Sequence, residues 1–293
     1  MPELPEVQAL VADLGSRLTG GRIARLDVTA FAALKTYDPA PSVLTGATVT
    51  AVTRHGKFLD LTAVGAATED KPVHLIIHLA RAGWLRWREN APAPGSGRGK
   101  GPIAARLVLD DGSGFDLTEA GTKKSLAIYV VRDPAEVPGI ARLGPDPLEP
   151  GFTADVLAGI LKRAGRSRIK GVLRDQSTIA GIGNAYSDEI LHVAKMSPFK
   201  AADMPPEDVQ TLYAAMQSTL RDAIARADGV SASELKAEKK SGLRVHGRTG
   251  EPCPVCGDTV RQVIYSDSTF QYCPTCQTGG KPLADRVLSR LLK

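Results

Sequence analysis

The spacing of hydrophobic residues divides the chain into a strand-rich first half and a helix-rich second half. From Val7 to Leu18 apolar residues recur every three or four positions, which predicts an amphipathic helix that ends at Gly20 and Gly21. Segments rich in β-branched residues follow, with partial alternation of apolar and polar positions. We expect strands at residues 22–29, 48–62, 74–79, 104–109, 115–118 and 126–131. Six short strands separated by turn residues are typical of a β-sandwich or a β-barrel.

The second half of the chain changes to a helical pattern after a proline-rich segment. Residues 132–151 hold five prolines without a clear hydrophobic period, and we interpret them as an interdomain linker. Helical spacing then returns and predicts helices around residues 152–161, 169–173, 186–194 and 209–224. We therefore expect an α+β protein of two domains. The predicted boundaries are 1–131 for the β-sandwich with its leading helix, 132–151 for the linker, 152–242 for a helical domain, 243–280 for a cysteine-containing segment and 281–293 for a basic tail.

The composition is that of a globular protein, with 43% hydrophobic and 24% charged residues. No apolar run approaches the roughly 20 residues that a membrane helix needs. The first ten residues carry acids where a secretory or transit peptide would carry basic residues. We expect a cytoplasmic protein without a membrane segment.

The net charge is +5, and its distribution is more informative than its size. Between Asp155 and Asp175 lie six cations and no acid. Such a run fits binding to a polyanion such as nucleic acid, and it fits equally a solvated helix face.

All four cysteines belong to one pattern, in which two C-x2-C pairs are separated by sixteen residues: Cys253, Cys256, Cys273 and Cys276. Four thiolates at this spacing can hold Zn²⁺ in a closed tetrahedral site. Two disulfides or four unrelated thiols are the alternatives, and the spacing and an intracellular setting argue against both. We expect one structural zinc ion that folds a β-hairpin and leaves no open position for catalysis.

A glycine-rich turn separates two of the predicted helices. Gly181 and Gly183 expose backbone N–H groups, and Asn184, a good N-cap residue, opens the next helix. Because the N-terminus of a helix attracts anions, this turn fits binding of a backbone phosphate. An ordinary helical hairpin is the alternative interpretation.

The N-terminus carries a possible nucleophile. Pro2 follows the initiator Met1, and removal of Met1 would expose a secondary amine that can form an imine at a sugar carbon. The carboxylates of Glu3 and Glu6 lie next to it and could perform acid–base chemistry. The alternative is that these acids only cap a helix N-terminus.

Together these motifs resemble the bifunctional DNA glycosylase/AP lyases of the formamidopyrimidine-DNA glycosylase and endonuclease VIII family. The motifs are, in chain order, MPELPEVQAL at the start, RHGKFL at 54–59, HLARAG at 78–83, LGPDPL at 143–148, DQSTIAGIGNAYSDEIL at 175–191 and CPTCQ at 273–277. The resemblance implies an N-terminal β-sandwich, a helix–two-turn–helix domain and a zinc finger, with DNA in the cleft between the domains. It also implies a monomer that binds double-stranded DNA containing a damaged base or an abasic site.

The resemblance further implies a role for each matching residue. Pro2 would attack C1′ of a flipped-out nucleotide and form a Schiff base, Glu3 would protonate the sugar ring oxygen, and Glu6 would position the amine or shuttle protons. An imine at C1′ acidifies the C2′ hydrogens, so β-elimination follows base loss and δ-elimination can follow that. Lys57 would hold a phosphate beside the lesion, as would Asn184 together with the Gly183 turn.

Three features depart from the family pattern and predict an altered contact with DNA. Ser268 stands where the zinc hairpin usually carries an arginine, so a phosphate contact would lose its charge. Arg81 stands where a void-filling methionine is usual, and residues 118–126 hold no arginine–phenylalanine pair to help it. Residues 229–242 lack the familiar element that covers oxidised guanine, although Lys170 could still approach the lesion.

These departures leave alternatives to a bifunctional glycosylase. One is an AP lyase with little base excision, and another is a non-catalytic binder of bent or abasic DNA. The presence of Pro2, Glu3, Glu6 and Lys57 argues against the binder, because binding alone does not require a nucleophile and an acid. A zinc-ribbon RNA-binding or ribosome-associated protein would explain the charge and the cysteines but not the N-terminal motif.

Overall fold

The chain folds into two units. The computed structural model describes residues 1–92, 103–265 and 268–284. The first unit contains Met1–Arg142 together with Ala227–Lys236, and the second contains Leu143–Arg226 with the described residues from Ala237 onward. The chain therefore passes between the units three times, once inside the segment expected to be a linker.

The first unit begins with the predicted amphipathic helix. Helix α1 spans Leu4–Leu18, with Pro5 in its first turn, where a missing N–H costs nothing. Its apolar face, which includes Leu10 and Leu14, is completely buried. The helix stops before Gly20, whose φ of +85° suits a residue without a Cβ atom.

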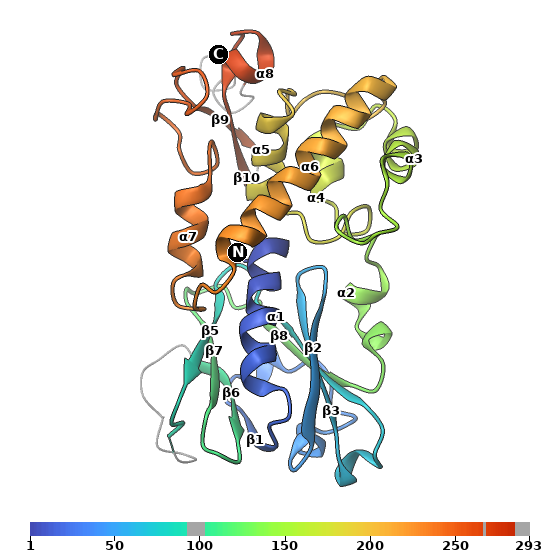
Figure 1. Ribbon diagram of the computed structural model, residues 1–293, viewed down its shortest axis with the longest axis vertical. Coiled ribbons are helices and arrows are strands. Elements are labelled where there is room, and N and C mark those ends of the chain that lie inside the picture. Colours follow the sequence, from blue (N-terminus) through green and yellow to red (C-terminus); the bar gives the residue numbers. More distant parts are fainter. Residues whose placement is uncertain (93–102, 266–267, 285–293) are drawn as a thin grey trace. The chain divides into compact units, whose positions relative to one another are not determined.

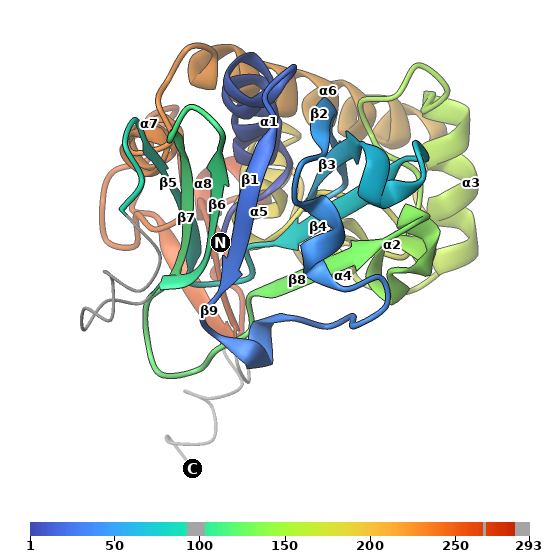
Figure 2. The ribbon, with the colours of Figure 1, turned by 90° about the horizontal axis from the view of Figure 1, so that it is seen from below.

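Two antiparallel four-stranded sheets make up the sandwich. The strand order of one sheet is β1 (Ile23–Val28), β6 (Ile103–Leu109), β7 (Gly114–Glu119) and β5 (Gly83–Arg88). The order of the other is β2 (Thr48–His55), β3 (Phe58–Val64), β4 (Val73–His78) and β8 (Ala127–Val131). Alternate residues of both sheets, such as Leu61 and Leu107, share one hydrophobic core with α1, which lies beside the two sheets (Figure 2). The expected β-sandwich with a leading helix is confirmed.

The strand predictions were wrong in two places. Residues 48–62 were expected as one strand, but the chain turns at Gly56 and Lys57 and forms the β2–β3 hairpin. Strand β5 was missed because its sequence GWLRWR does not alternate: Gly83, Trp84 and Leu85 are all buried. A Pro/Gly-rich segment, residues 91–102, lies largely outside the described residues.

The remaining elements of the first unit are short. They are η1 (Phe31–Ala33), η2 (Pro41–Leu44), η3 (Ala66–Thr68), η4 (Pro134–Glu136) and α2 (Pro138–Ala141). Val137 and Ile140 pack on the outer face of the β2-β3-β4-β8 sheet, so part of this face is also covered.

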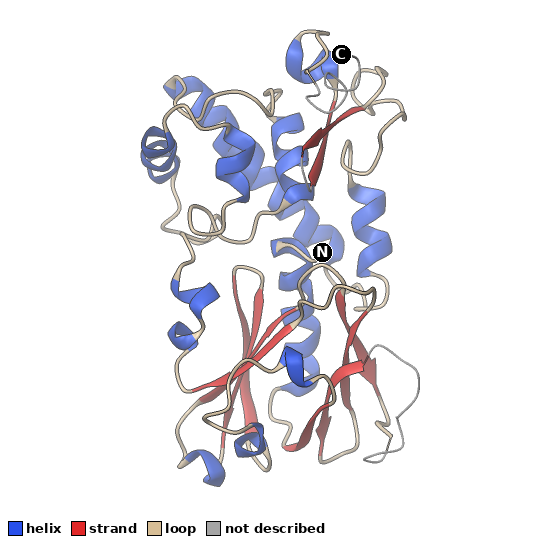
Figure 3. Ribbon diagram, turned by 180° about the vertical axis from the view of Figure 1, so that it is seen from behind, coloured by secondary structure: helices blue, strands red, loops and turns tan. Residues whose placement is uncertain are grey.

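The second unit is mainly helical, as the colouring by secondary structure shows (Figure 3). Its predicted helices are present as α3 (Ala154–Ala164), α4 (Ile169–Arg174), α5 (Asn184–Val193) and α6 (Pro206–Ala227). Helix α7 (Leu235–Gly242) was not predicted, because its lysine- and glutamate-rich sequence carries little hydrophobic signal. It starts in the residues grouped with the first unit and ends in the second.

A small β-hairpin completes the second unit (Figure 1). Strand β9 (Arg261–Tyr265) pairs with β10 (Ser268–Tyr272), and α8 (Pro274–Thr278) follows directly. The predicted strand and turn structure around the cysteines is confirmed. No helix in the described part of the chain is long and apolar enough to cross a membrane.

Candidate functional site

The two N-terminal carboxylates are held together at the start of α1. The Glu3 backbone N–H donates to Oε2 of Glu6 at 2.9 Å, and the Glu3 side chain accepts from the Glu6 backbone in return. Both residues are only 3% exposed, and Pro2 is buried beside them. The helix-capping arrangement is therefore present. It also fixes both carboxyl groups close to the residue that would carry the amine.

Lys57 lies in the tight β2–β3 turn, where Gly56 adopts a φ of +54°. Next to this turn, the buried carboxylate of Asp60 is bonded at 2.9 Å both to His55 Nε2 and to His74 Nδ1. Burial opposes ionisation of Asp60, but the two histidine hydrogen bonds outweigh it and lower the pKa of this carboxyl. The hairpin that carries Lys57 is thus anchored by its own polar cluster.

A second contact ties this hairpin to the N-terminal helix. Nε of Arg54, in β2, donates to Oε1 of Gln8, in α1, at 2.7 Å. The helix that presents Glu3 and Glu6 and the strand that leads to Lys57 are therefore joined within the first unit.

His78 is a further residue of this region, and it was not among the predicted site residues. Its ring packs on Phe58 with centroids 4.6 Å apart. Burial, helped by the nearby positive charge of Lys57, lowers the pKa of His78 to about 4. The ring is therefore neutral at physiological pH. The HLARAG motif begins with this histidine and was the signal that could have identified it.

Arg81 is exposed at the tip of the β4–β5 turn. Ala80 before it adopts a φ of +52°, which is uncommon for a residue with a Cβ atom. The turn closes with a hydrogen bond from Gly83 N–H to Leu79 O at 2.9 Å. A Cβ atom on Gly83 would lie 2.1 Å from that same oxygen, so only glycine fits there. The tight turn projects the arginine cation into solvent.

The glycine-rich turn before α5 is shaped by one side chain, that of Gln176. Its Nε2 donates to the backbone oxygens of Arg174 at 2.8 Å and Ile182 at 2.6 Å. Its Oε1 accepts from the Gly181 backbone N–H at 3.0 Å. Since Gly181 has a φ of +86°, the turn combines a glycine in the left-handed region with three hydrogen bonds from the glutamine.

Asn184 is not the helix cap that the sequence suggested. The cap is Gly183, and Asn184 is the first helical residue. Its side-chain Nδ2 donates to the Thr269 backbone oxygen in β10 at 2.7 Å. Its Oδ1 is buried without a hydrogen-bond partner among the described residues. The amide therefore connects the turn to the β-hairpin.

Lys170 is one of the six cations of the basic run, yet it is only 5% exposed. Its Nζ donates to Asp188 Oδ1 at 2.6 Å, to Ser187 Oγ at 2.8 Å and to the Asn184 backbone oxygen at 3.2 Å. Asp188 in turn is bonded to Nδ1 of His246 at 2.7 Å. The predicted DNA contact of Lys170 stays a prediction, while its ammonium group already has a structural role.

The four cysteines converge at the end of the hairpin. The Sγ atoms of Cys253 and Cys276 are 3.9 Å apart, and those of Cys256 and Cys273 are 3.3 Å apart. Without a cation, burial raises the pKa of Cys273 to about 11. A divalent cation would reverse this preference, because a coordinating thiol is deprotonated. The donor set and its geometry fit a structural metal ion.

His192 contributes a fifth donor atom to this cluster. One of its ring nitrogens and the Sγ atoms of Cys253, Cys273 and Cys276 all lie within 4.8 Å of one another. Burial and the positive charge of Arg244 lower the pKa of His192 to about 4. Nothing in the sequence links this residue to the cysteines, because it lies 61 positions before the first of them.

A further residue of α5, Glu189, contacts the segment that precedes the β-hairpin. Glu189 accepts hydrogen bonds from the backbone N–H groups of Arg244, Val245 and His246 at 2.7–3.0 Å.

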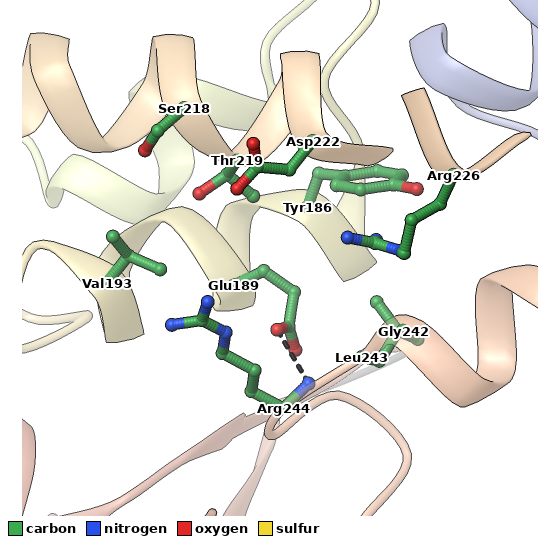
Figure 4. Close-up of a pocket in the computed structure, with 10 residues that line it drawn as sticks. All are labelled: Tyr186, Glu189, Val193, Ser218, Thr219, Asp222, Arg226, Gly242, Leu243 and Arg244. Carbon is green, nitrogen blue, oxygen red and sulfur yellow. Dashed lines mark hydrogen bonds between the residues drawn. The ribbon is translucent and has the colours of Figure 1, made fainter. Parts of the chain in front are cut away.

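A pocket of about 40 Å³ lies between α5 and α6. Figure 4 shows the residues that line it and the bond from Arg244 to Glu189. This volume is far below the roughly 300–1,000 Å³ of ordinary ligand sites, so the pocket does not accommodate a nucleobase. The polar face of α5 serves assembly of the second unit.

Comparison with known proteins assigns both units to one family. Residues 1–124 match the model of the formamidopyrimidine-DNA glycosylase N-terminal domain, and residues 143–234 match that of its H2TH domain. The formamidopyrimidine-DNA glycosylase of Symbiobacterium thermophilum is 35% identical over 289 residues, covering 94% of this chain and 89% of that protein. An uncharacterized formamidopyrimidine-DNA glycosylase-like protein of Mycobacterium tuberculosis is 60% identical over 161 residues, covering 54% of this chain and 99% of that protein.

Solved structures of the family have the same fold. The Lactococcus lactis enzyme in complex with DNA containing FAPY-dG has a TM-score of 0.80 at 26% identity, with 94% of this chain and 100% of that chain covered. The MutM (Fpg) protein of Thermus thermophilus has a TM-score of 0.77 at 29% identity, with 96% and 100% covered.

A β-sandwich with this N-terminal motif, an H2TH domain and a cysteine hairpin define a base-excision-repair enzyme, a DNA glycosylase with AP lyase activity. The chain belongs to the formamidopyrimidine-DNA glycosylase family. The family, fold class and activity expected from the sequence are thereby confirmed. The roles of individual residues and the domain boundaries that the sequence predicted stay predictions. The side chain of Ser268 and most of the basic tail, from residue 285 on, lie outside the described residues.

Proposed function

We propose that the nucleophile of this enzyme is the secondary amine of Pro2, exposed by removal of Met1. The observation that carries this proposal is the arrangement at the start of α1. There, two buried glutamates beside Pro2 hold each other: the Glu3 backbone N–H donates to Glu6 Oε2 at 2.9 Å, and the Glu3 side chain accepts from the Glu6 backbone. Side chains held in one geometry lose little freedom when a substrate binds, which favours catalysis.

In the proposed reaction, the amine of Pro2 forms a bond to C1′ of the damaged nucleotide, and the bond from C1′ to the base breaks. Glu3 donates a proton to the ring oxygen O4′ as the C1′–O4′ bond opens, which leaves an iminium ion on Pro2. Loss of a C2′ proton then expels the 3′ phosphate oxygen by β-elimination. Glu6 holds the Glu3 backbone and receives or returns protons. Hydrolysis of the iminium ion releases Pro2 for the next turnover.

We further propose that the substrate is duplex DNA with a damaged base or an abasic site. Lys57 and the turn at Gly183 and Asn184 bind phosphates, Arg81 enters the space left by the flipped nucleotide, and Ser268 makes an uncharged contact from the hairpin. Lys170 acts indirectly, since its Nζ donates to the Asn184 carbonyl at 3.2 Å.

The assembly and location that we propose follow from this substrate. The protein acts as a monomer on genomic DNA, in the cytoplasm. It holds one Zn²⁺, bound by Cys253, Cys256, Cys273 and Cys276. The distances of 3.3 and 3.9 Å between paired Sγ atoms support this set, because thiolates about 2.3 Å from one ion lie close to each other. When bound, the ion supplies no chemistry to the reaction and only stabilises the hairpin.

Borohydride trapping tests the nucleophile. Reduction converts an iminium ion into a stable covalent complex, so the Met1-processed protein should become linked to a duplex that contains one abasic site. Mass spectrometry should place the adduct on Pro2. The variant Pro2→Gly should bind the same duplex with similar affinity but turn over about 10–100-fold more slowly. An adduct on a lysine, or unchanged turnover of Pro2→Gly, would move the nucleophile elsewhere.

The same experiment distinguishes the bifunctional enzyme from a lyase with little base excision, which the changed Arg81 and Ser268 positions keep as a second candidate. Duplexes with oxidised purine or pyrimidine lesions are compared with the abasic duplex. Trapping on both kinds of DNA indicates a bifunctional glycosylase. Trapping on the abasic duplex alone indicates a lyase that has lost base recognition.

A further inference from the structure

His192 lies against the cysteine cluster, from the last turn of α5. Its Nε2 is 3.3 Å from Sγ of Cys253, and the residue is only 2% exposed. Cys253 itself is 3% exposed. The polar ring of His192 is therefore buried against the buried thiol of Cys253. When a metal ion is bound, Nε2 can act in one of two ways: it ligates the ion, or it donates a hydrogen bond to the sulfur.

The other ring nitrogen distinguishes these two possibilities. Nδ1 of His192 is buried, and no atom of the described residues forms a hydrogen bond with it. A histidine that ligates a metal through one nitrogen almost always donates the N–H of the other to a carboxylate, a carbonyl or water. Were Nε2 a ligand, the proton of the neutral ring would sit on Nδ1 as a buried donor without an acceptor. With the proton on Nε2, Nδ1 keeps only a lone pair, and the donor faces a sulfur.

The cysteines give a second, independent argument. Sγ of Cys256 lies 3.3 Å from Sγ of Cys273, and Sγ of Cys253 lies 3.9 Å from Sγ of Cys276, spacings that suit four thiolates around one ion. A structural zinc site is almost always four-coordinate, so four thiolates leave no position for a nitrogen ligand.

We propose that His192 is a positioning residue of the metal site, whose Nε2–H donates a hydrogen bond to the Cys253 thiolate without ligating the ion. This inference rests on the four-cysteine zinc site proposed above and identifies the group that supports it. Four thiolates around Zn²⁺ carry a net charge of −2, and a hydrogen bond withdraws charge from one of them. Cys253 is therefore the least reactive thiolate, whereas the exposed Cys256 is the one at which oxidants and chelators begin to remove the ion.

The contact also joins the metal to the phosphate-binding turn. Asn184 at the start of α5 bonds to β10, Asp188 accepts from the Gln271 backbone N–H at 3.2 Å, and His192 reaches Cys253. These residues are spaced by four positions and share one face of the helix. Three successive turns of α5 are thus bonded to the cysteine segment, the last of them at the metal site.

Cobalt substitution and zinc release test the proposal in the full-length protein. The variants are His192→Phe, which removes the donor, and His192→Gln, whose amide can reach the sulfur. The matched control is Val193→Ala, a change on the same helical turn. We expect the Co²⁺ absorption spectrum of four sulfur ligands in the wild type and in all three variants. Zinc transfer to a colorimetric chelator should be about 10-fold faster in His192→Phe, partly restored in His192→Gln and unchanged in Val193→Ala.

Several outcomes would overturn the inference. A wild-type Co²⁺ spectrum of three sulfurs and one nitrogen would make His192 a ligand, and equal zinc release from His192→Phe and the wild type would leave the histidine without effect. If His192→Phe does not fold, a long-range ¹H–¹⁵N NMR spectrum of the wild type still locates the ring proton, and a proton on Nδ1 would contradict the proposal. Native mass spectrometry separates these results from failure of the zinc site: a folded wild-type protein without one bound zinc ion would refute the zinc proposal itself.

Discussion

His78 and Lys57 illustrate how burial sets the charge of single groups near the proposed catalytic residues. Burial and the lysine charge lower the pKa of His78 to about 4, so this ring is neutral when Lys57 is charged. A neutral ring does not repel a second cation or compete with Lys57 for a phosphate. If Lys57 binds a phosphate as proposed, the positive charge at this turn comes from the lysine and not from the histidine.

This pKa shift makes the stability of the first unit depend on pH. Between about pH 4 and pH 6.5 the unfolded state binds a proton at this histidine and the folded state does not. The contribution of His78 to the free energy of unfolding is therefore fully present above pH 6.5, and it is lost as the pH falls towards 4. In the variant His78→Asn, the free energy of unfolding should therefore change less between pH 6.5 and pH 4; this slope of stability against pH is the quantity to compare. The measurement is the urea midpoint followed by tryptophan fluorescence, because both tryptophans, Trp84 and Trp87, lie in the first unit. An unchanged slope in the variant would show that His78 titrates normally in the folded protein.

The buried pair of Lys170 and Asp188 gives a second prediction for a single residue. Lys170→Met removes one partner and leaves a carboxylate that is completely buried. Loss of one member of such a pair costs about 3–5 kcal/mol, and the hydrogen bond between His246 Nδ1 and Asp188 offsets part of this. The free energy of unfolding is measured by far-UV circular dichroism at saturating zinc.

Arg166→Met is the matched control, because Arg166 belongs to the same basic run but is exposed. It should change the free energy of unfolding by less than about 0.5 kcal/mol. Equal effects of the two substitutions would mean that Lys170 is solvated in solution.

The sequence could not reveal the state of Lys170. A lysine in an acid-free run has the pattern of a solvated or phosphate-binding residue, and its partner Asp188 lies 18 positions further on. His246, the other partner of Asp188, lies another 58 positions away. By contrast, the gathering of the cysteines could be predicted, because each C-x2-C pair is local in the sequence and the double pair is typical of a zinc site.

At the scale of elements, the turn before α5 depends on Gln176 as much as on its glycines. Gln176→Ala removes three hydrogen bonds to the turn. We expect the backbone of the turn to lose its fixed conformation, and the affinity for abasic duplex to fall about 10-fold regardless of sequence. Fluorescence anisotropy with a labelled duplex measures the affinity.

Gln210→Ala is the matched control for this prediction, because Gln210 is exposed on α6. It should bind DNA as the wild type does, and both variants should retain zinc. Wild-type affinity of Gln176→Ala would show that the turn keeps its shape without the side chain.

Element boundaries were predictable only where the local sequence dictates them. The start of α1 carries a capping box and its end carries two glycines, so the helix was predicted closely. The β2–β3 hairpin turns through only two residues, Gly56 and Lys57, between two β-branched segments, and the hydrophobic pattern hardly marks such a turn. Strand β5 is identified by its pairing with β7, which involves residues about 30 positions away.

At the scale of the whole molecule, the proposed metal site and the proposed phosphate-binding turn are joined by contacts within the second unit. Removal of the ion with a chelator should unfold the cysteine segment and release α5, because Asn184, Asp188, Glu189 and His192 would lose their partners. Binding to abasic duplex should then be lost. In hydrogen exchange, α5 and β10 should lose protection, whereas β3 and β4, in the other unit, should keep it. Lesion-specific binding by the metal-free protein would contradict this prediction.

The overall organisation was predictable from the order of motifs, but one part of it was not. Residues 227–236 start at the last residue of α6, whose other residues lie in the second unit, and yet they belong to the first unit. Ala227, Ala232 and Leu235 are buried in the core of the sandwich, and the Ala232 backbone oxygen accepts a hydrogen bond from Nε1 of Trp84 at 2.8 Å. Three scattered apolar residues in a polar segment carry no period, so only the fold reveals where they pack.

This return of the chain has a practical consequence for dissecting the enzyme. A fragment that stops at Arg142 would lack three core residues of its own domain and would leave the Trp84 indole N–H without its acceptor. Such a fragment should expose apolar surface and aggregate. A stable isolated sandwich requires that residues 227–236 be supplied as well, either grafted through a linker or added as a peptide. If the added peptide restores the folded sandwich, the first unit can be assembled from two separate chains, and its folding then depends on the concentration of the peptide.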